Sequence, residues 1–99
     1  MSERAVECRT PTPGKRPTRI AGWKFDTIRE AILDVVPPDP PGLAFAELAS
    51  EVRRRLDDAT LACLGSVAWY ATTVKLELEV RGELVRLPGS PQHLMRRLD

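Results

Sequence analysis

Apolar side chains recur along this chain at the spacing that places them on one side of a helix. The first such stripe consists of Phe25, Ile28, Ile32 and Val36. Their separation by three or four residues predicts an amphipathic helix over residues 23–36. Pro37-Pro38 ends this helix, because proline lacks the backbone donor that the next helical turn needs.

The same spacing predicts two further helices. One begins near Phe45 and closes at Arg53–Arg55, a triplet interpreted as a solvated helix end. Its apolar stripe consists of Phe45, Leu48, Ala49, Val52 and Leu56. The other begins after Ser66, a good N-cap, and stops at Gly82. Its stripe consists of Val67, Tyr70, Ala71, Val74 and Leu78. Residues 57–65 are predicted to be a connector between them.

The last of these helices carries a second apolar flank. Trp69, Leu76 and Val80 lie outside its main stripe, so the helix is apolar over more than half of its circumference. Such a helix must be contacted from two sides. Only a narrow polar face remains, made of Ser66, Thr72, Thr73, Lys75 and Glu79.

Short β-prone segments lie before the second helix and after the third. Leu43-Ala44 predicts a short edge strand, and residues 83–87 and 93–96 predict the two strands of a hairpin. Pro88-Gly89 suits the turn, since proline presets its first backbone angle and glycine accepts the positive second one. The fold is therefore predicted to be mainly α with a small β-hairpin, in the order helix, short strand, helix, helix, hairpin.

Residues 1–22 are predicted to form a basic, proline-rich arm ahead of a domain spanning residues 23–99. Three prolines and a glycine within residues 10–18 disfavour a helix and suit an extended or turning backbone. The simplest interpretation is a disordered leader. The alternative is an arm whose two ends are anchored by Val6 and Ile20.

This order of elements resembles the winged helix-turn-helix superfamily. Residues 74–86 (VKLELEVRGELVR) are similar to the junction of recognition helix and wing in bacterial regulators of the MarR and PadR kind, and residues 43–49 resemble the entry to the preceding helix. The resemblance covers residues 23–97 and implies three helices plus a wing, a fold that often binds DNA. Residues 10–15 (TPTPGK) and 65–76 (GSVAWYATTVKL) also resemble a family of small bacterial proteins of unassigned function, which implies no activity.

Composition narrows the function classes. The net charge is only +1, yet residues 1–24 hold six basic and two acidic side chains, whereas residues 25–60 hold four basic and eight acidic ones. Two cysteines and one histidine are too few for a zinc site. Cys8 is expected to be exposed and Cys63 to be a buried small hydrophobe. Without a membrane-spanning run or a signal peptide, a cytoplasmic protein is expected.

The first functional hypothesis is a DNA-binding module, a small transcription regulator that contacts double-stranded DNA. Its candidate residues on the third helix are Ser66, Trp69, Thr72 and Thr73, with Lys75 as a phosphate contact. Further candidates are Arg86, His93 and Arg96 in the wing and Lys15 and Arg16 in the arm. The third helix lacks the exposed Arg, Asn or Gln that strong base readout requires. Trp69 is expected to be a core residue instead.

The second hypothesis is a protein-interaction module on the same scaffold, with an exposed apolar patch around Trp69, Leu76 or Val80. Catalysis is not expected, because His93 is the only histidine and has no neighbouring Ser, Cys or Asp motif. Ser66 is interpreted as a helix cap, not as a nucleophile. No metal or other cofactor is expected, and the chain is expected to be a monomer or a weak homodimer.

Overall fold

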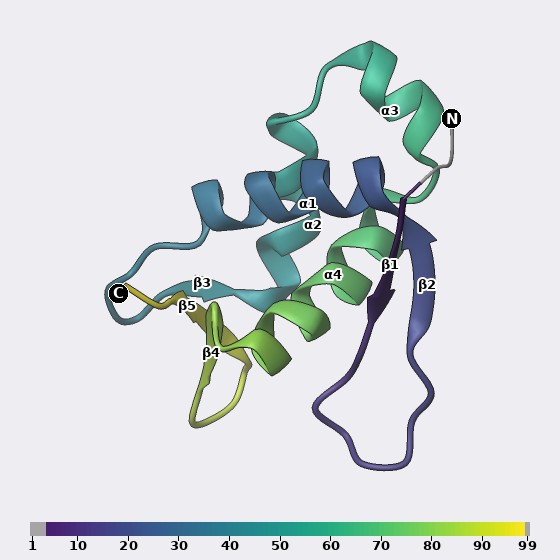
Figure 1. The fold of residues 1–99 in the computed structure, drawn as a ribbon. Coiled ribbons are helices and arrows are strands. Elements are labelled where there is room, and N and C mark those ends of the chain that lie inside the picture. The colour runs from purple at the N-terminus through teal and green to yellow at the C-terminus, as the bar shows by residue number, and fades with distance from the viewer. Residues whose placement is uncertain (1–3, 99) are drawn as a thin grey trace.

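Three helices that cross one another build the body of the protein, and two hairpins attach to it (Figure 1). The computed structural model describes residues 4–98, of which about half are helical. The helices are α1 (Gly22–Val35), α2 (Phe45–Arg54), α3 (Asp58–Leu64) and α4 (Val67–Arg81). The strands are β1 (Ala5–Cys8), β2 (Thr18–Ala21), β3 (Leu43–Ala44), β4 (Leu84–Leu87) and β5 (His93–Arg96).

The core lies where α1, α2 and α4 meet, and it is almost entirely aliphatic. The predicted stripes supply its buried residues, chiefly Phe25, Ile28, Ile32, Leu48, Val52, Val67, Ala71, Val74 and Leu78. The spacing of apolar residues therefore predicted the inward faces of all three helices correctly. Burial of these side chains is the main favourable contribution to folding.

The predicted edge strand and C-terminal hairpin are both present and pair in one sheet, in the order β3-β5-β4. All pairs are antiparallel, and Leu43 lies opposite Leu94. We call β4, β5 and their turn the C-terminal hairpin. Gly42 has φ +71°, and a Cβ there would lie 2.1 Å from the carbonyl oxygen of Leu94. Only glycine therefore lets the chain approach β5 this closely.

The N-terminal segment is a second hairpin, so the expectation of a disordered leader is wrong for residues 4–21. Strands β1 and β2 pair antiparallel, with Val6 opposite Ile20. Ile20 and Cys8 are buried, and the hairpin packs on α1 and α4. We call β1, β2 and their turn the N-terminal hairpin. Residues 1–3 of the predicted arm, and Asp99, lie outside the described residues.

The predicted connector 57–65 contains a helix, α3, at the edge of the body away from both hairpin turns (Figure 1). Asp57 caps it, because its carboxylate accepts a hydrogen bond from the Thr60 amide at 2.7 Å. Leu64 is buried and Leu61 packs against the core, which turns Cys63 toward solvent. Both cysteine expectations are thus wrong, because Cys8 is 2% exposed whereas Cys63 is exposed.

Candidate functional site

Helix α4 directs its charged residues toward the rest of the protein. Lys75 is only 2% exposed, and its ammonium lies 2.8 Å from Glu79 and 4.7 Å from the ring centre of Phe45. Burial lowers the pKa of Lys75, and Glu79 opposes this by favouring the charged form. Lys75 was expected on an exposed face as a phosphate contact. That expectation is wrong, because the buried ammonium is already paired.

Glu77 of α4 holds the N-terminal hairpin in place. Its carboxylate is 1% exposed and accepts hydrogen bonds from the Arg9 backbone N–H at 2.8 Å and from Arg9 Nε and Nη2 at 3.0 and 2.8 Å. Arg81 Nε donates to it at 2.7 Å. Burial alone would raise the pKa of Glu77, but these donors outweigh burial and lower it to about 2. At neutral pH this carboxylate is therefore ionised and fully paired.

The C-terminal hairpin is joined to α4 by a similar contact. Arg86 Nε donates to Glu79 at 3.2 Å. Arg86 was a candidate for phosphate contact, and in the structure its charge is compensated by this acid. Both hairpins thus attach a cationic side chain to a carboxylate of the same helix.

The opposite side of α4 is uncharged and largely apolar. It consists of Trp69, Thr72, Thr73, Leu76 and Val80, which we call the outer stripe. These positions follow the same i, i+3, i+4, i+7, i+11 spacing as the buried stripes, and they lie roughly opposite the core-facing residues. Trp69 is 47% exposed and the other four are partly exposed. The expectation that Trp69 belongs to the core is therefore wrong.

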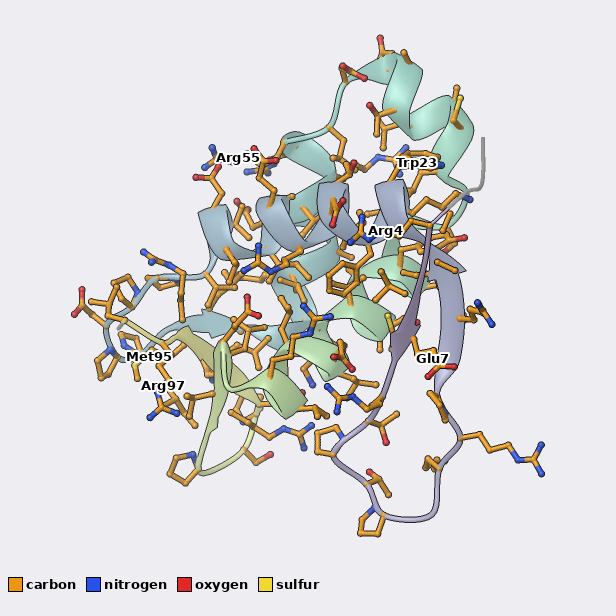
Figure 2. The ribbon with its side chains drawn as sticks, viewed as in Figure 1. Arg4, Glu7, Trp23, Arg55, Met95 and Arg97 are labelled. Carbon is orange, nitrogen blue, oxygen red and sulfur yellow. The ribbon has the colours of Figure 1, made fainter. Side chains whose placement is uncertain are left out.

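A row of aromatic rings continues the outer stripe to the start of α1. Trp69 meets Tyr70 edge to face at 4.8 Å. Lys24 Nζ lies 4.8 Å from the ring centre of Tyr70 and 5.6 Å from that of Trp23, and it donates hydrogen bonds to Tyr70 Oη and the Leu64 carbonyl. Trp23 is exposed at the N-terminal end of α1, beside α3 (Figure 2). Sequence reasoning missed Trp23 and Lys24, although Trp23 lies off the predicted stripe of its helix.

The remaining predicted site residues do not gather on the outer stripe. Ser66 Oγ accepts a hydrogen bond from the Trp69 amide at 3.1 Å and caps α4 next to the stripe, as predicted. His93 Nδ1 lies 3.0 Å from the Pro91 carbonyl oxygen within the C-terminal hairpin. Arg96 Nε donates to the Val36 carbonyl at the end of α1, which separates it from the α4 residues. Lys15 and Arg16 are exposed in the turn of the N-terminal hairpin.

A hollow of about 360 Å³ lies at the N-terminus of α4. It is lined by Ala49, Ser50, Arg53, Gly65, Ser66, Val67 and Ala68. Arg53 is exposed and has no acidic partner among residues 4–98. Its position beside Ser66 was missed because the arginine triplet was interpreted only as a solvated helix end. A cation, a hydroxyl and a helix N-terminus here could meet a phosphate.

Two kinds of site are absent from the described part of the chain. Within residues 4–98 no group of His, Cys, Asp or Glu side chains is arranged to hold a metal ion. Among the helices of that range, none has the length and apolar character needed to cross a membrane.

Comparison with known proteins assigns the chain to a family but identifies no function for it. A model described as "Family of unknown function (DUF6958)" matches residues 5–94, nearly the whole chain. The chain therefore belongs to this family, which agrees with its resemblance to proteins of unassigned function. Comparisons with curated proteins and with solved structures find no match.

Proposed function

We propose that this member of the DUF6958 family is a non-enzymatic winged-helix module that binds a protein partner through the outer stripe. The order α1, β3, α2, α4, β4, β5 and the sheet order β3-β5-β4 support the winged-helix assignment, with α3 as an extra helix before α4. In this assignment α4 is the helix that faces a partner, and the C-terminal hairpin is the wing.

The observation that carries this proposal is that α4 is apolar on its outward side as well as on its core-facing side. Its charged residues are buried or paired inside the molecule, whereas Trp69, Leu76 and Val80 face outward. Covering exposed apolar surface contributes about 25 cal/mol per Å². Tryptophan is also the residue type most enriched among those that dominate binding energy at protein interfaces. The outer stripe is therefore suited to an apolar surface of another protein.

Base recognition fits the outer stripe poorly. Reading base edges requires paired donors and acceptors, most often from Arg, Asn or Gln. The stripe offers only the hydroxyl groups of Thr72 and Thr73 and the indole N–H of Trp69. A desolvated apolar stripe in a groove lined by polar base edges would leave those edges unpaired.

The proposal is tested by photo-crosslinking in cells of the native host. A photo-reactive amino acid at Thr72, inside the outer stripe, is expected to give a discrete adduct whose mass identifies the partner. Leu76→Glu in the same chain is expected to abolish the adduct while lowering the thermal unfolding temperature by only a few degrees. The matched control places the same reagent at Glu47, which is exposed on α2. Equal adducts from both positions, or none from Thr72, would reject the proposal.

A second candidate function is DNA binding, and one arrangement favours it. The hollow with Ser50, Arg53 and Ser66 at the N-terminus of α4 could hold a backbone phosphate, and Lys15 and Arg16 are exposed for further contacts. Fluorescence anisotropy with a generic duplex at low and moderate salt tests it. DNA binding predicts that Arg53→Ala lowers the salt slope of the binding constant by about 1. Absence of binding at low salt rejects it.

A further inference from the structure

A second hollow, of about 430 Å³, lies between the root of the C-terminal hairpin and α1. It is lined by Arg29, Leu33, Glu83, Arg96 and Arg97. Three guanidinium groups and one carboxylate leave it with an excess of two positive charges. Its volume falls within the range of small-molecule sites, roughly 300–1,000 Å³. No residue of the outer stripe takes part in it.

The arginines are held by their backbones while much of their hydrogen-bonding capacity stays free. Arg96 N donates to the Pro37 carbonyl at 2.9 Å, and Arg97 N donates to the Glu83 carbonyl at 3.0 Å. The side chain of Arg96 uses only Nε, which reaches a carbonyl of the α1 terminus. Arg97 has no acidic partner within residues 4–98, and Figure 2 shows it on the side of the molecule that carries the C-terminal hairpin. The fold therefore places two guanidinium groups with unused donors at one hollow.

The single acid of the hollow is already engaged. Arg29 Nε donates to Glu83 Oε1 at 2.8 Å. This pair removes one positive and one negative charge, so the remaining charge comes from Arg96 and Arg97. An anion that enters would meet these two guanidinium groups and the uncommitted N–H groups of Arg29.

The neighbouring hollow limits how large such an anion can be. It measures about 750 Å³ and shares Leu33 and Arg96 with the hollow of about 430 Å³. Its other charged lining residues are Glu30, Asp34, Arg55 and Asp57. Arg55 pairs with Asp34 at 2.6 Å, which leaves an excess of negative charge beyond Leu33. A polyanion extending along the groove would be repelled there, whereas a compact anion would not.

We propose that the hollow at Arg29, Arg96 and Arg97 binds the phosphate group of a small phosphomonoester. A phosphate near neutral pH carries close to two negative charges, which matches the excess charge of the hollow. Its oxygens also match the planar donor geometry of a guanidinium group. A phosphate has more acceptor oxygens than a carboxylate and can therefore engage more than one guanidinium group. This site is independent of the partner proposed for the outer stripe.

The test is a titration of the ¹⁵N-labelled full chain with inorganic phosphate at constant ionic strength. Saturable amide shifts are expected at residues 83–84 and 96–97. Arg97→Ala is expected to raise the dissociation constant about tenfold. Arg19→Ala removes an exposed arginine of β2, which lines none of the hollows described above, and is expected to leave it unchanged. Glu83→Gln is expected to lower it several-fold, because repulsion of the phosphate is removed.

Three outcomes would overturn the proposal. One is an unchanged dissociation constant in Arg97→Ala when its thermal unfolding temperature matches that of the parent chain. Another is shifts that grow linearly with phosphate and are spread over all exposed arginines. The third is a short oligonucleotide that binds the same residues more tightly than phosphate, which would assign the hollow to a nucleic-acid backbone.

Discussion

The flanks of α4 and its outward side differ in a way that departs from the usual pattern of a surface helix. The flanks of the helix carry Lys75, Glu77 and Glu79, while the outer stripe carries Trp69 and Leu76. The charged residues tolerate burial because each hairpin brings an arginine to a carboxylate of this helix. In the outer stripe, Trp69 is exposed and Leu76 and Val80 are partly exposed. This difference shows that contacts with neighbouring elements, and not residue polarity alone, decide which residues of a helix are buried.

The largest expected effect comes from two leucines that lie two positions apart on α4. Leu78 is fully buried, so Leu78→Ala should lower the free energy of unfolding by about 3 kcal/mol. Leu76→Ala makes the same chemical change on the outer stripe and should cost less than about 1 kcal/mol. Urea unfolding of both variants measures the contrast. Equal losses would mean that the outer stripe belongs to the core and not to an interface.

A smaller effect is expected from the buried carboxylate. Glu77→Gln removes the charge that pairs with Arg9 and Arg81 and should cost about 2 kcal/mol at pH 7. Because folding lowers the pKa of Glu77 from 4.5 to about 2, its contribution is complete above pH 4.5 and is lost as the pH falls toward 2. The free energy of unfolding, measured against pH, should therefore fall more steeply in this range for the parent chain than for the variant. Glu47→Gln, an exposed acid, serves as the control.

The smallest effect concerns reactivity and not stability. Cys63 is exposed and should react readily with a thiol reagent at pH 7.5. Cys8 should stay unmodified in the folded protein, because burial, together with the charge of Glu77, raises its pKa to about 11. Mass spectrometry should find one modified cysteine in the native chain and two in urea. Modification of Cys8 at the rate of Cys63 would show that the N-terminal hairpin does not cover it.

Local apolar spacing predicted much of the fold. The stripes of α1, α2 and α4 depend on residues close in sequence, and each of these helices formed where it was predicted. Helix α3 was missed, because Leu61 and Leu64 alone give too short a stripe to separate a helix from a connector. The apolar residues around Cys63 suggested that Cys63 is buried. In α3, however, Leu61 and Leu64 face the core while Cys63 faces solvent.

The candidate site was less accessible to sequence reasoning. Burial of Glu77 depends on Arg9, which lies 68 positions earlier in the chain. Nothing close to Glu77 in the sequence marks it as buried, and Lys75 was placed on the polar face of the helix together with Glu79. The outer stripe had the opposite problem, since the apolar residues Trp69 and Leu76 suggested a second buried contact. Long-range pairing therefore decided which side of α4 remained exposed.

The attachment of the N-terminal hairpin to α4 has a consequence for biosynthesis. Residues 5–21 leave the ribosome long before residues 67–81, on which they dock, have been made. An isolated two-stranded hairpin is marginally stable at best in water. This earlier segment therefore acquires its lasting structure only once the helix that carries Glu77 has emerged.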